Sequence, residues 1–255
     1  MTQYTTEDIY FKSFESQYDF CLDDETQALV SRLDGRAFHT FTRKCEKPFD
    51  NKLKESLESA TEALCKEFHP LIAYHQSDEI SIIFILKPKA TASDFPFGGR
   101  LNKLNSVFSS IVASVFNKKY NTDKLATFDC RTFQLEYTDI IPYLKWRQHD
   151  CYKNAINQIA LSKFSHYQLL NVNTKQKIEM LKNNNVSIEH YHPKHIYGTL
   201  MYPEKIELTI KDLERLPEKH QARLNPDLTF YRTTMTYQYC KVEECSYLKN
   251  KLGTI

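Results

Sequence analysis

Residues 71–86 have the sequence LIAYHQSDEISIIFIL, in which a short polar segment separates two apolar runs. Residues 71–75 and 80–86 are rich in the β-branched and aromatic residues that favour strands. Residues 76–79 carry the serine and acidic residues that are typical of a tight connection. The pattern therefore predicts a β-hairpin, and the other elements can be placed around it.

Strand and helix patterns continue on both sides of this hairpin. Residues 27–33 predict a strand that ends at Asp34 and Gly35. Asp50 is a suitable N-cap for a helix with an apolar stripe at Leu53, Leu57, Ala60, Leu64 and Phe68. After the hairpin, a second helix carries Leu101, Leu104, Val107, Phe108, Ile111, Val112 and Val115 on one side, and residues 127–135 predict a further strand. The order β-α-β-β-α-β predicts an α+β fold with a ferredoxin-like core.

The second half of the sequence mixes helices and strands. A helix opened by Pro142 extends to about residue 161, and a polar helix ends at residues 183–185. The remaining patterns predict strands over 197–203 and 206–210, a helix over 213–224 and a strand over 228–240. No clear linker separates the two halves. We therefore expect residues 1–135 to form the core with an N-terminal extension, and residues 136–255 to form an α/β extension packed on it.

The composition excludes several function classes. With 255 residues, 41% of them hydrophobic, the chain can bury a substantial core. It has 5 glycines, and neither the G-x-G-x-x-G motif nor the G-x-x-x-x-G-K-[ST] motif occurs. The net charge is +2, so any nucleic-acid surface is expected to be a local patch.

Apolar segments and cysteines bear on the compartment. The longest apolar stretch, residues 80–86, is interrupted by Ser81, so we expect no membrane span. Glu7 and Asp8 stand near the start, where a secretory signal would be basic and apolar. The seven cysteines form no C-x-x-C pair, which favours reduced thiols over disulfides or zinc ligands. The expected location is intracellular, either cytoplasmic or mitochondrial.

Acidic residues follow two of the predicted strands. In a β-α-β-β-α-β unit the third strand lies between the first two, so the end of the first strand meets the hairpin. This brings Asp34 close to Asp78 and Glu79. Carboxylates gathered in this way repel one another, and a hard divalent cation such as Mg²⁺ relieves the repulsion. The alternative is that each acid caps its own turn; the coincidence of both at one edge favours a metal site.

Basic residues offer candidate phosphate ligands. Arg100 and Lys103 occupy the first turn of the predicted helix after Gly98 and Gly99. Cations at a helix N-terminus are unfavourable unless an anion binds there, and we expect this turn to lie near the acids. Lys47 and Arg131 are expected to add positive charge at the same edge. The alternative for Arg100 and Lys103 is a solvated helix start, and for Lys47 and Arg131 it is a surface ion pair.

Residues of the helix at 142–161 form a third candidate group. Arg147, Asp150 and Asn154 share one face of this helix, whereas Trp146 belongs to a neighbouring stripe and is expected to pack. The histidines of the H-x-H-x-x-H segment at 190–195 are expected in a loop that contains Pro193 rather than in a metal site.

Several of these segments together resemble a known family. RLDGRAFH at 32–39, HQSDE at 75–79, Arg100-x-x-Lys103, FDCR at 128–131 and WRQ-x-D at 146–150 occur in this order. Over residues 28–160 the chain resembles the tRNA(His) guanylyltransferase superfamily, polymerases that add nucleotides in the 3′-to-5′ direction. The resemblance implies a palm-like catalytic core, two Mg²⁺ ions, nucleoside triphosphates including ATP as substrates, tRNA as partner and a homotetramer.

The resemblance also implies roles for individual residues. Asp34, Gly35 and Asp78 would hold metal, and Asp34, Asp78 and Glu79 would be the catalytic acids. The nucleotide site would comprise Asp34, Gly35, Arg36, Ala37, Phe38, His39, Lys47, Ser77, Asp78, Arg100 and Lys103. Arg131, Arg147 and Asn154 would contact RNA or phosphate.

Departures from the family pattern point to one branch of the superfamily. True tRNA(His) guanylyltransferases carry H-I-N-N after the W-R-Q-x-D-C segment, and this chain has YKNA at 152–155. The pattern is closer to the guanylyltransferase-like branch, whose members repair truncated tRNA 5′ ends with a template. We therefore expect template-dependent 3′-5′ nucleotide addition to tRNA after ATP-dependent activation of the 5′ end. Alternatives are untemplated addition of G to tRNA(His), a palm-fold nucleotide cyclase and a tRNA-binding module without turnover.

Overall fold

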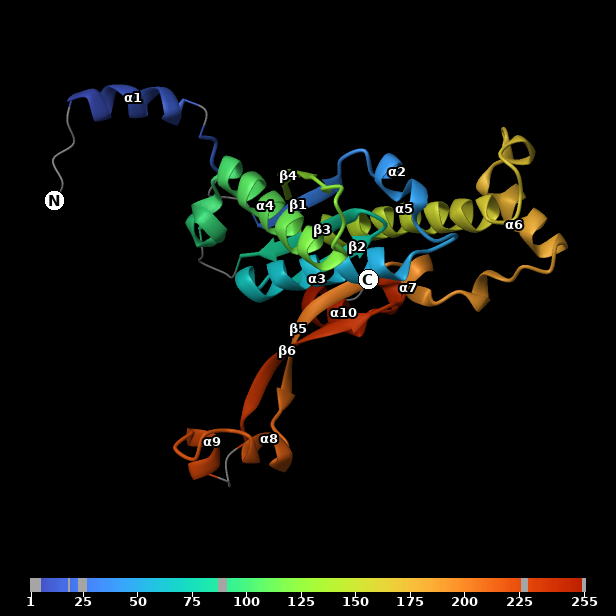
Figure 1. Cartoon of the computed structure of the whole chain (residues 1–255). Coiled ribbons are helices and arrows are strands. Elements are labelled where there is room, and N and C mark those ends of the chain that lie inside the picture. Colours follow the sequence, from blue (N-terminus) through green and yellow to red (C-terminus); the bar gives the residue numbers. More distant parts are fainter. Residues whose placement is uncertain (1–5, 18, 23–26, 87–90, 226–228, 254–255) are drawn as a thin grey trace.

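A six-stranded antiparallel sheet with the strand order β4-β1-β3-β2-β5-β6 organises the chain (Figure 1). The computed structural model describes residues 6–17, 19–22, 27–86, 91–225 and 229–253. The strands are β1 (Ala28–Gly35), β2 (Ile72–Gln76), β3 (Glu79–Ile85), β4 (Phe128–Leu135), β5 (Thr199–Glu207) and β6 (Tyr231–Gln238). The order of the first four strands confirms that β3 lies between β1 and β2.

Helices connect the strands and cover the sheet. The long ones are α1 (Thr6–Ser16), α3 (Asn51–Phe68), α4 (Leu101–Tyr120), α5 (Ile140–Leu161), α6 (Thr174–Asn183) and α10 (Ser246–Leu252). The short ones are α2 (Phe38–Phe41), α7 (Pro193–Ile196), α8 (Ile210–Glu214) and α9 (Gln221–Leu224). Asp50 caps α3 as expected, because its Oδ1 accepts the backbone N–H of Leu53 at 2.8 Å. No helix in the described ranges combines the length and the apolar character that a membrane crossing requires.

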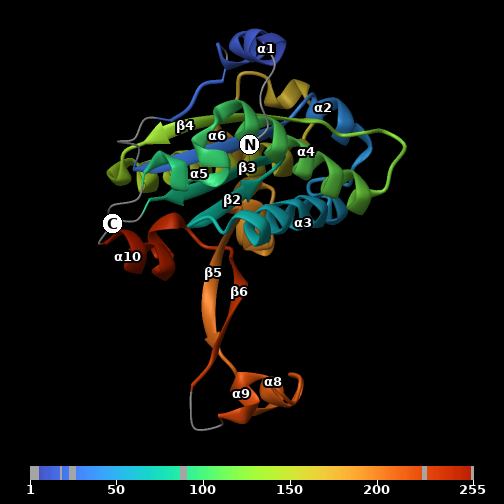
Figure 2. The same ribbon diagram turned by 90° about the vertical axis from the view of Figure 1, so that its left-hand side faces the viewer.

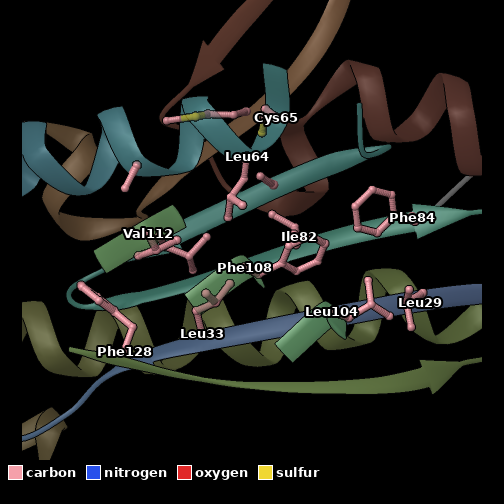
Figure 3. Close-up of a cluster of buried hydrophobic side chains, with 14 of the residues drawn as sticks. Leu29, Leu33, Leu64, Cys65, Ile82, Phe84, Leu104, Phe108, Val112 and Phe128 are labelled. Carbon is pink, nitrogen blue, oxygen red and sulfur yellow. The ribbon is translucent and has the colours of Figure 1, made fainter. Parts of the chain in front are cut away.

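Alternation along the strands divides the interior into two main cores. On one face Leu29, Leu33, Ile82 and Phe84 pack against α3 and α4, with Leu64 and Phe108 among their partners (Figure 3). On the other face Val30, Ile72 and Ile83 pack against α5 and α10. All seven cysteines are free, in agreement with the expected reduced state.

The C-terminal region differs from the prediction in two places. Residues 197–203 and 206–210 were expected as two strands, but β5 is continuous because its residues stay paired with β6 from Leu200 to Glu207. Pro203 is tolerated since β2 pairs with β5 only at residues 199–201, so that Pro203 has a single neighbouring strand. The helix predicted over 213–224 is divided into α8 and α9, which cap the two-stranded arm formed by β5 and β6 (Figure 2).

Candidate active site

The end of β1 meets the β2–β3 hairpin, as the topology predicts. Asp34 pairs with Glu79 across β1 and β3, and the backbone N–H of Gly35 donates to the carbonyl oxygen of Asp78 at 3.2 Å. Ser77 adopts a positive φ of 49° in the turn, and its hydroxyl donates to Oδ1 of Asp78 at 2.9 Å. Two segments separated by more than 40 residues in sequence therefore share one edge of the sheet.

Acidic side chains lie in a row across this edge. Asp34 is directly opposite Glu79 on β3 and opposite Asp129 on β4, and residues paired in this way share a face of the sheet. Burial and the charge of Asp129 raise the pKa of Asp34. Burial also raises the pKa of Asp78, and the charge of Asp34 raises it further. Ionisation of Asp34 and Asp78 is thus less favourable in the folded protein than in water.

The donors at this edge fit a magnesium site. Among the described residues no group of three or more His, Cys, Asp and Glu side chains could hold a metal ion. Mg²⁺ uses one or two carboxylates and completes its shell with other oxygen donors, so such a group is not required. Asp34, Asp78 and the carbonyl of Gly35 offer only hard oxygen donors. Burial raises the pKa of both acids, and a bound cation would offset this cost of their ionised forms. A Cβ at Gly35 would lie 2.2 Å from the Phe38 ring, so no larger residue fits at this position.

We expect Asp78→Asn to stabilise the metal-free protein at neutral pH. Because the pKa of Asp78 is raised in the folded state, its ionisation lowers the free energy of unfolding as the pH rises from about 3.9 through the raised pKa. Thermal melting in EDTA should therefore give the variant the higher Tm at pH 7 and no difference below pH 4. Added Mg²⁺ should raise the Tm of the wild type more than that of the variant. A lower Tm for the variant at pH 7 in EDTA would contradict this assignment.

A cavity of about 450 Å³ opens beside the hairpin. Its walls include eight of the residues predicted for the nucleotide and RNA sites, namely Gly35, Ala37, Phe38, His39, Lys47, Ser77, Asp78 and Asn154. Asp34, Glu79 and Arg36 do not line it. Arg131 is exposed, lies 3.7 Å from Asp129 and acts on the pKa of Asp34, so it is near the acids as expected.

Arg100 and Lys103 were expected near the acids, but the structure places them at the opposite end of α4. The chain leaves the hairpin along β3, so the helix that follows begins at the far end of the sheet. The last turn of α4 is the part near the cavity, since Tyr120 packs against Phe41 with ring centroids 5.4 Å apart. A helix of 20 residues is roughly 30 Å long, which separates Arg100 and Lys103 from the acids.

Arg147, which was predicted to contact RNA or phosphate, is buried and paired with acidic side chains. Its Nη1 donates to Oε2 of Glu79 at 2.7 Å, and its Nη2 donates to Asp150. Its guanidinium also lies 3.6 Å from the centroid of the Trp146 ring. Glu79 therefore points toward α5 and does not line the cavity, and its role among the catalytic acids stays a prediction. The arrangement indicates that Glu79 and Arg147 position the hairpin.

Sequence reasoning missed several residues of the cavity wall, among them Lys54, Gln158 and His195. His195 stacks on Phe49 with the ring centroids 4.4 Å apart, and burial lowers its pKa to about 4. A signal for Lys54 was present, because it lies on the buried side of α3 beside Leu57.

Known proteins share sequence similarity with this chain. The family model described as tRNAHis guanylyltransferase (Thg1) matches residues 8–136, which is half of the chain. The chain belongs to the tRNAHis guanylyltransferase family. An uncharacterized protein of Acanthamoeba polyphaga mimivirus is 32% identical over 203 residues, or 68% of each protein. The probable tRNA(His) guanylyltransferase of Dictyostelium discoideum is 37% identical over 159 residues, or 58% of each, so the match spans little more than half of that relative.

Solved structures of the tRNAHis guanylyltransferase family share the whole fold. A bacterial tRNAHis guanylyltransferase-like protein in complex with ATP superimposes with a TM-score of 0.75 at 26% identity, over 96% of this chain and 95% of that one. The complex of such a protein with GTP gives a TM-score of 0.74 at 25% identity, with the same coverage. The family segments recognised in the sequence thus lie in a fold that is shared with proteins solved in complex with ATP and with GTP.

Proposed function

We propose that the protein is a template-dependent 3′-5′ nucleotidyltransferase that adds nucleotides to the 5′ end of tRNA after ATP-dependent activation of that end. The observation that carries the proposal is the cavity at the end of β1, which is lined by Gly35, the turn residues Ser77 and Asp78, and Lys47. The similar bacterial proteins are described in complex with ATP and with GTP, which supports a nucleotide in this cavity. The family description supports tRNA as the second substrate.

Asp34, Gly35 and Asp78 would hold two Mg²⁺ ions together with the phosphates of the substrate. When bound, such ions would lower the pKa of the attacking 3′-hydroxyl and neutralise negative charge on the leaving phosphate. Lys47 would bind the phosphates, and Phe38 and His39 would fix the nucleotide against α2. In the transfer, the 3′-oxygen of the incoming nucleotide forms a bond to the 5′ phosphorus of the RNA, and the bond from that phosphorus to the activating AMP breaks.

The proposal extends to the architecture. The strand order β4-β1-β3-β2 with α3 and α4 on one face supports the relation to polymerase palm domains. A homotetramer and an intracellular, cytoplasmic or mitochondrial location belong to the same proposal and rest on the family resemblance and on the reduced cysteines.

Nucleotide addition to 5′-truncated tRNAs tests this function. Transcripts that lack one 5′ nucleotide and carry each of the four bases opposite the gap are incubated with Mg²⁺, ATP and single NTPs. We expect the added nucleotide to follow the opposing base. Addition of G whatever the opposing base would identify untemplated guanylyl transfer, and a cyclic product from NTPs alone would identify a cyclase. Retention of tRNA without any product in all arms would indicate a binding module.

A further inference from the structure

Lys54 is a buried lysine in the wall of the cavity. The residue is 7% exposed, and its Nζ lies 3.4 Å from Nδ1 of His75 on β2. The nearby carboxylate of Glu58 is directed to the other side of that imidazole, with Oε1 at 3.8 Å from Nε2. Among the described residues, Lys54 has no ion pair with a carboxylate.

The surroundings leave donors of Lys54 unused. Burial lowers the pKa of Lys54 to about 8, so the side chain is mainly an ammonium at neutral pH. Burial also lowers the pKa of His75 to about 3, so the imidazole is neutral and its Nδ1 can accept one hydrogen bond. An ammonium group has three N–H donors, and a buried donor without an acceptor is costly. A ligand with an acceptor atom would remove this cost.

The position of Lys54 suits a base rather than phosphate. Lys54 lies on α3 and contacts His75 in β2, whereas Asp78 lies in the turn that follows β2, so the lysine and the acid reach the cavity from different elements. The wall beside it contains the stacked rings of Phe49 and His195, whose planes are 3° apart, and the charge of Lys54 acts on the pKa of His195. A flat aromatic surface next to a hydrogen-bond donor matches the shape and chemistry of a nucleobase.

Resting on the proposed function, we propose that Lys54 donates a hydrogen bond to the 6-oxo oxygen of a purine base and biases the cavity toward guanosine over adenosine nucleotides. Guanine presents O6 as an acceptor, whereas adenine presents an amino group at the same position. An amino group facing an ammonium would leave donors on both sides unpaired, which disfavours adenine. Lys54 is thus assigned as a specificity-determining residue.

Equilibrium binding by titration calorimetry tests this assignment without RNA. The probes are GTP, ATP and 2-aminopurine riboside triphosphate, which lacks O6. The proteins are the full-length wild type, Lys54→Met, and Lys66→Met as a control with the same change at an exposed position of α3. We expect the wild type and the control to bind GTP about tenfold more tightly than ATP or the 2-aminopurine analogue, as for a charge-assisted hydrogen bond. In Lys54→Met the affinity for GTP should fall about tenfold, whereas the affinities for ATP and for the analogue should change less than about threefold.

Other outcomes overturn the proposal in distinguishable ways. Equal weakening of all three ligands by Lys54→Met would indicate a phosphate contact, and no change would show that Lys54 is not used. Equal affinity of the wild type for GTP and its analogue would exclude the O6 contact even if the variant did not fold. Failure of the wild type to bind any of the three would refute the nucleotide function itself.

Discussion

Asp78→Asn should abolish nucleotide addition while the protein stays folded. Asp78 is the one acid that both lines the cavity and lies in the turn against Gly35. Loss of its charge would remove a ligand of the proposed metal site, and we expect the rate of addition to fall about 1,000-fold or more, equivalent to about 4 kcal/mol of transition-state stabilisation. The measurement is single-turnover extension of 5′-truncated tRNA, with tRNA affinity determined in parallel and expected to be unchanged or increased.

Asp129→Asn is the matched control for this experiment. Asp129 faces Asp34 across β1 and β4, so the variant removes the same charge from the same edge of the sheet without altering the cavity wall. We expect its extension rate to stay within about tenfold of the wild type. Extension by Asp78→Asn at a rate close to that of the control would remove Asp78 from the proposed metal site.

Arg147→Met should strongly destabilise the fold. The ion pair joins β3 to α5, and the side chains of Arg147 and Glu79 are 7% and 10% exposed. Removal of the guanidinium leaves buried negative charge without a partner, which typically costs 3–5 kcal/mol. For a protein of this size we expect the Tm to fall by roughly 10 °C in thermal melting followed by circular dichroism.

A double variant separates charge from packing in this pair. With Glu79→Gln in the same chain, the uncompensated buried charge is absent, and we expect most of the Tm to return. Equal Tm values for the single and double variants would show that the loss arises from packing around Trp146 instead.

The sequence predicted the elements that backbone periodicity determines. The hairpin, its position next to β1 and the meeting of Asp34 with Asp78 follow from alternating strands and from the order of the elements. The direction of α4 also follows from that order, because β3 leads away from the hairpin. Arg100 and Lys103 at the start of α4 therefore lie at the opposite end of the helix from the acids, although a glycine pair followed by two cations is typical of a phosphate site.

The rotation of the helices was harder to predict. Arg147 lies among the buried residues Leu144 and Cys151 of α5, and Lys54 lies next to Leu57 of α3. The sequence pattern does not predict the partners of these charged residues, because Glu79 and His75 come from β-strands and only the packing of the helices on the sheet brings them into contact. Such residues become interpretable once the packing partner of each helix is known.

The cavity has a consequence for how the chain can be divided. Its walls combine the hairpin and α3 with Asn154 and Gln158 of α5 and His195 of α7, so each half of the sequence contributes one side. A fragment that ends at residue 135 would expose the face of the sheet that carries Val30 and Ile83, and would lack part of the pocket. A complete cavity therefore needs both halves of the sequence, and neither half alone would carry the proposed site.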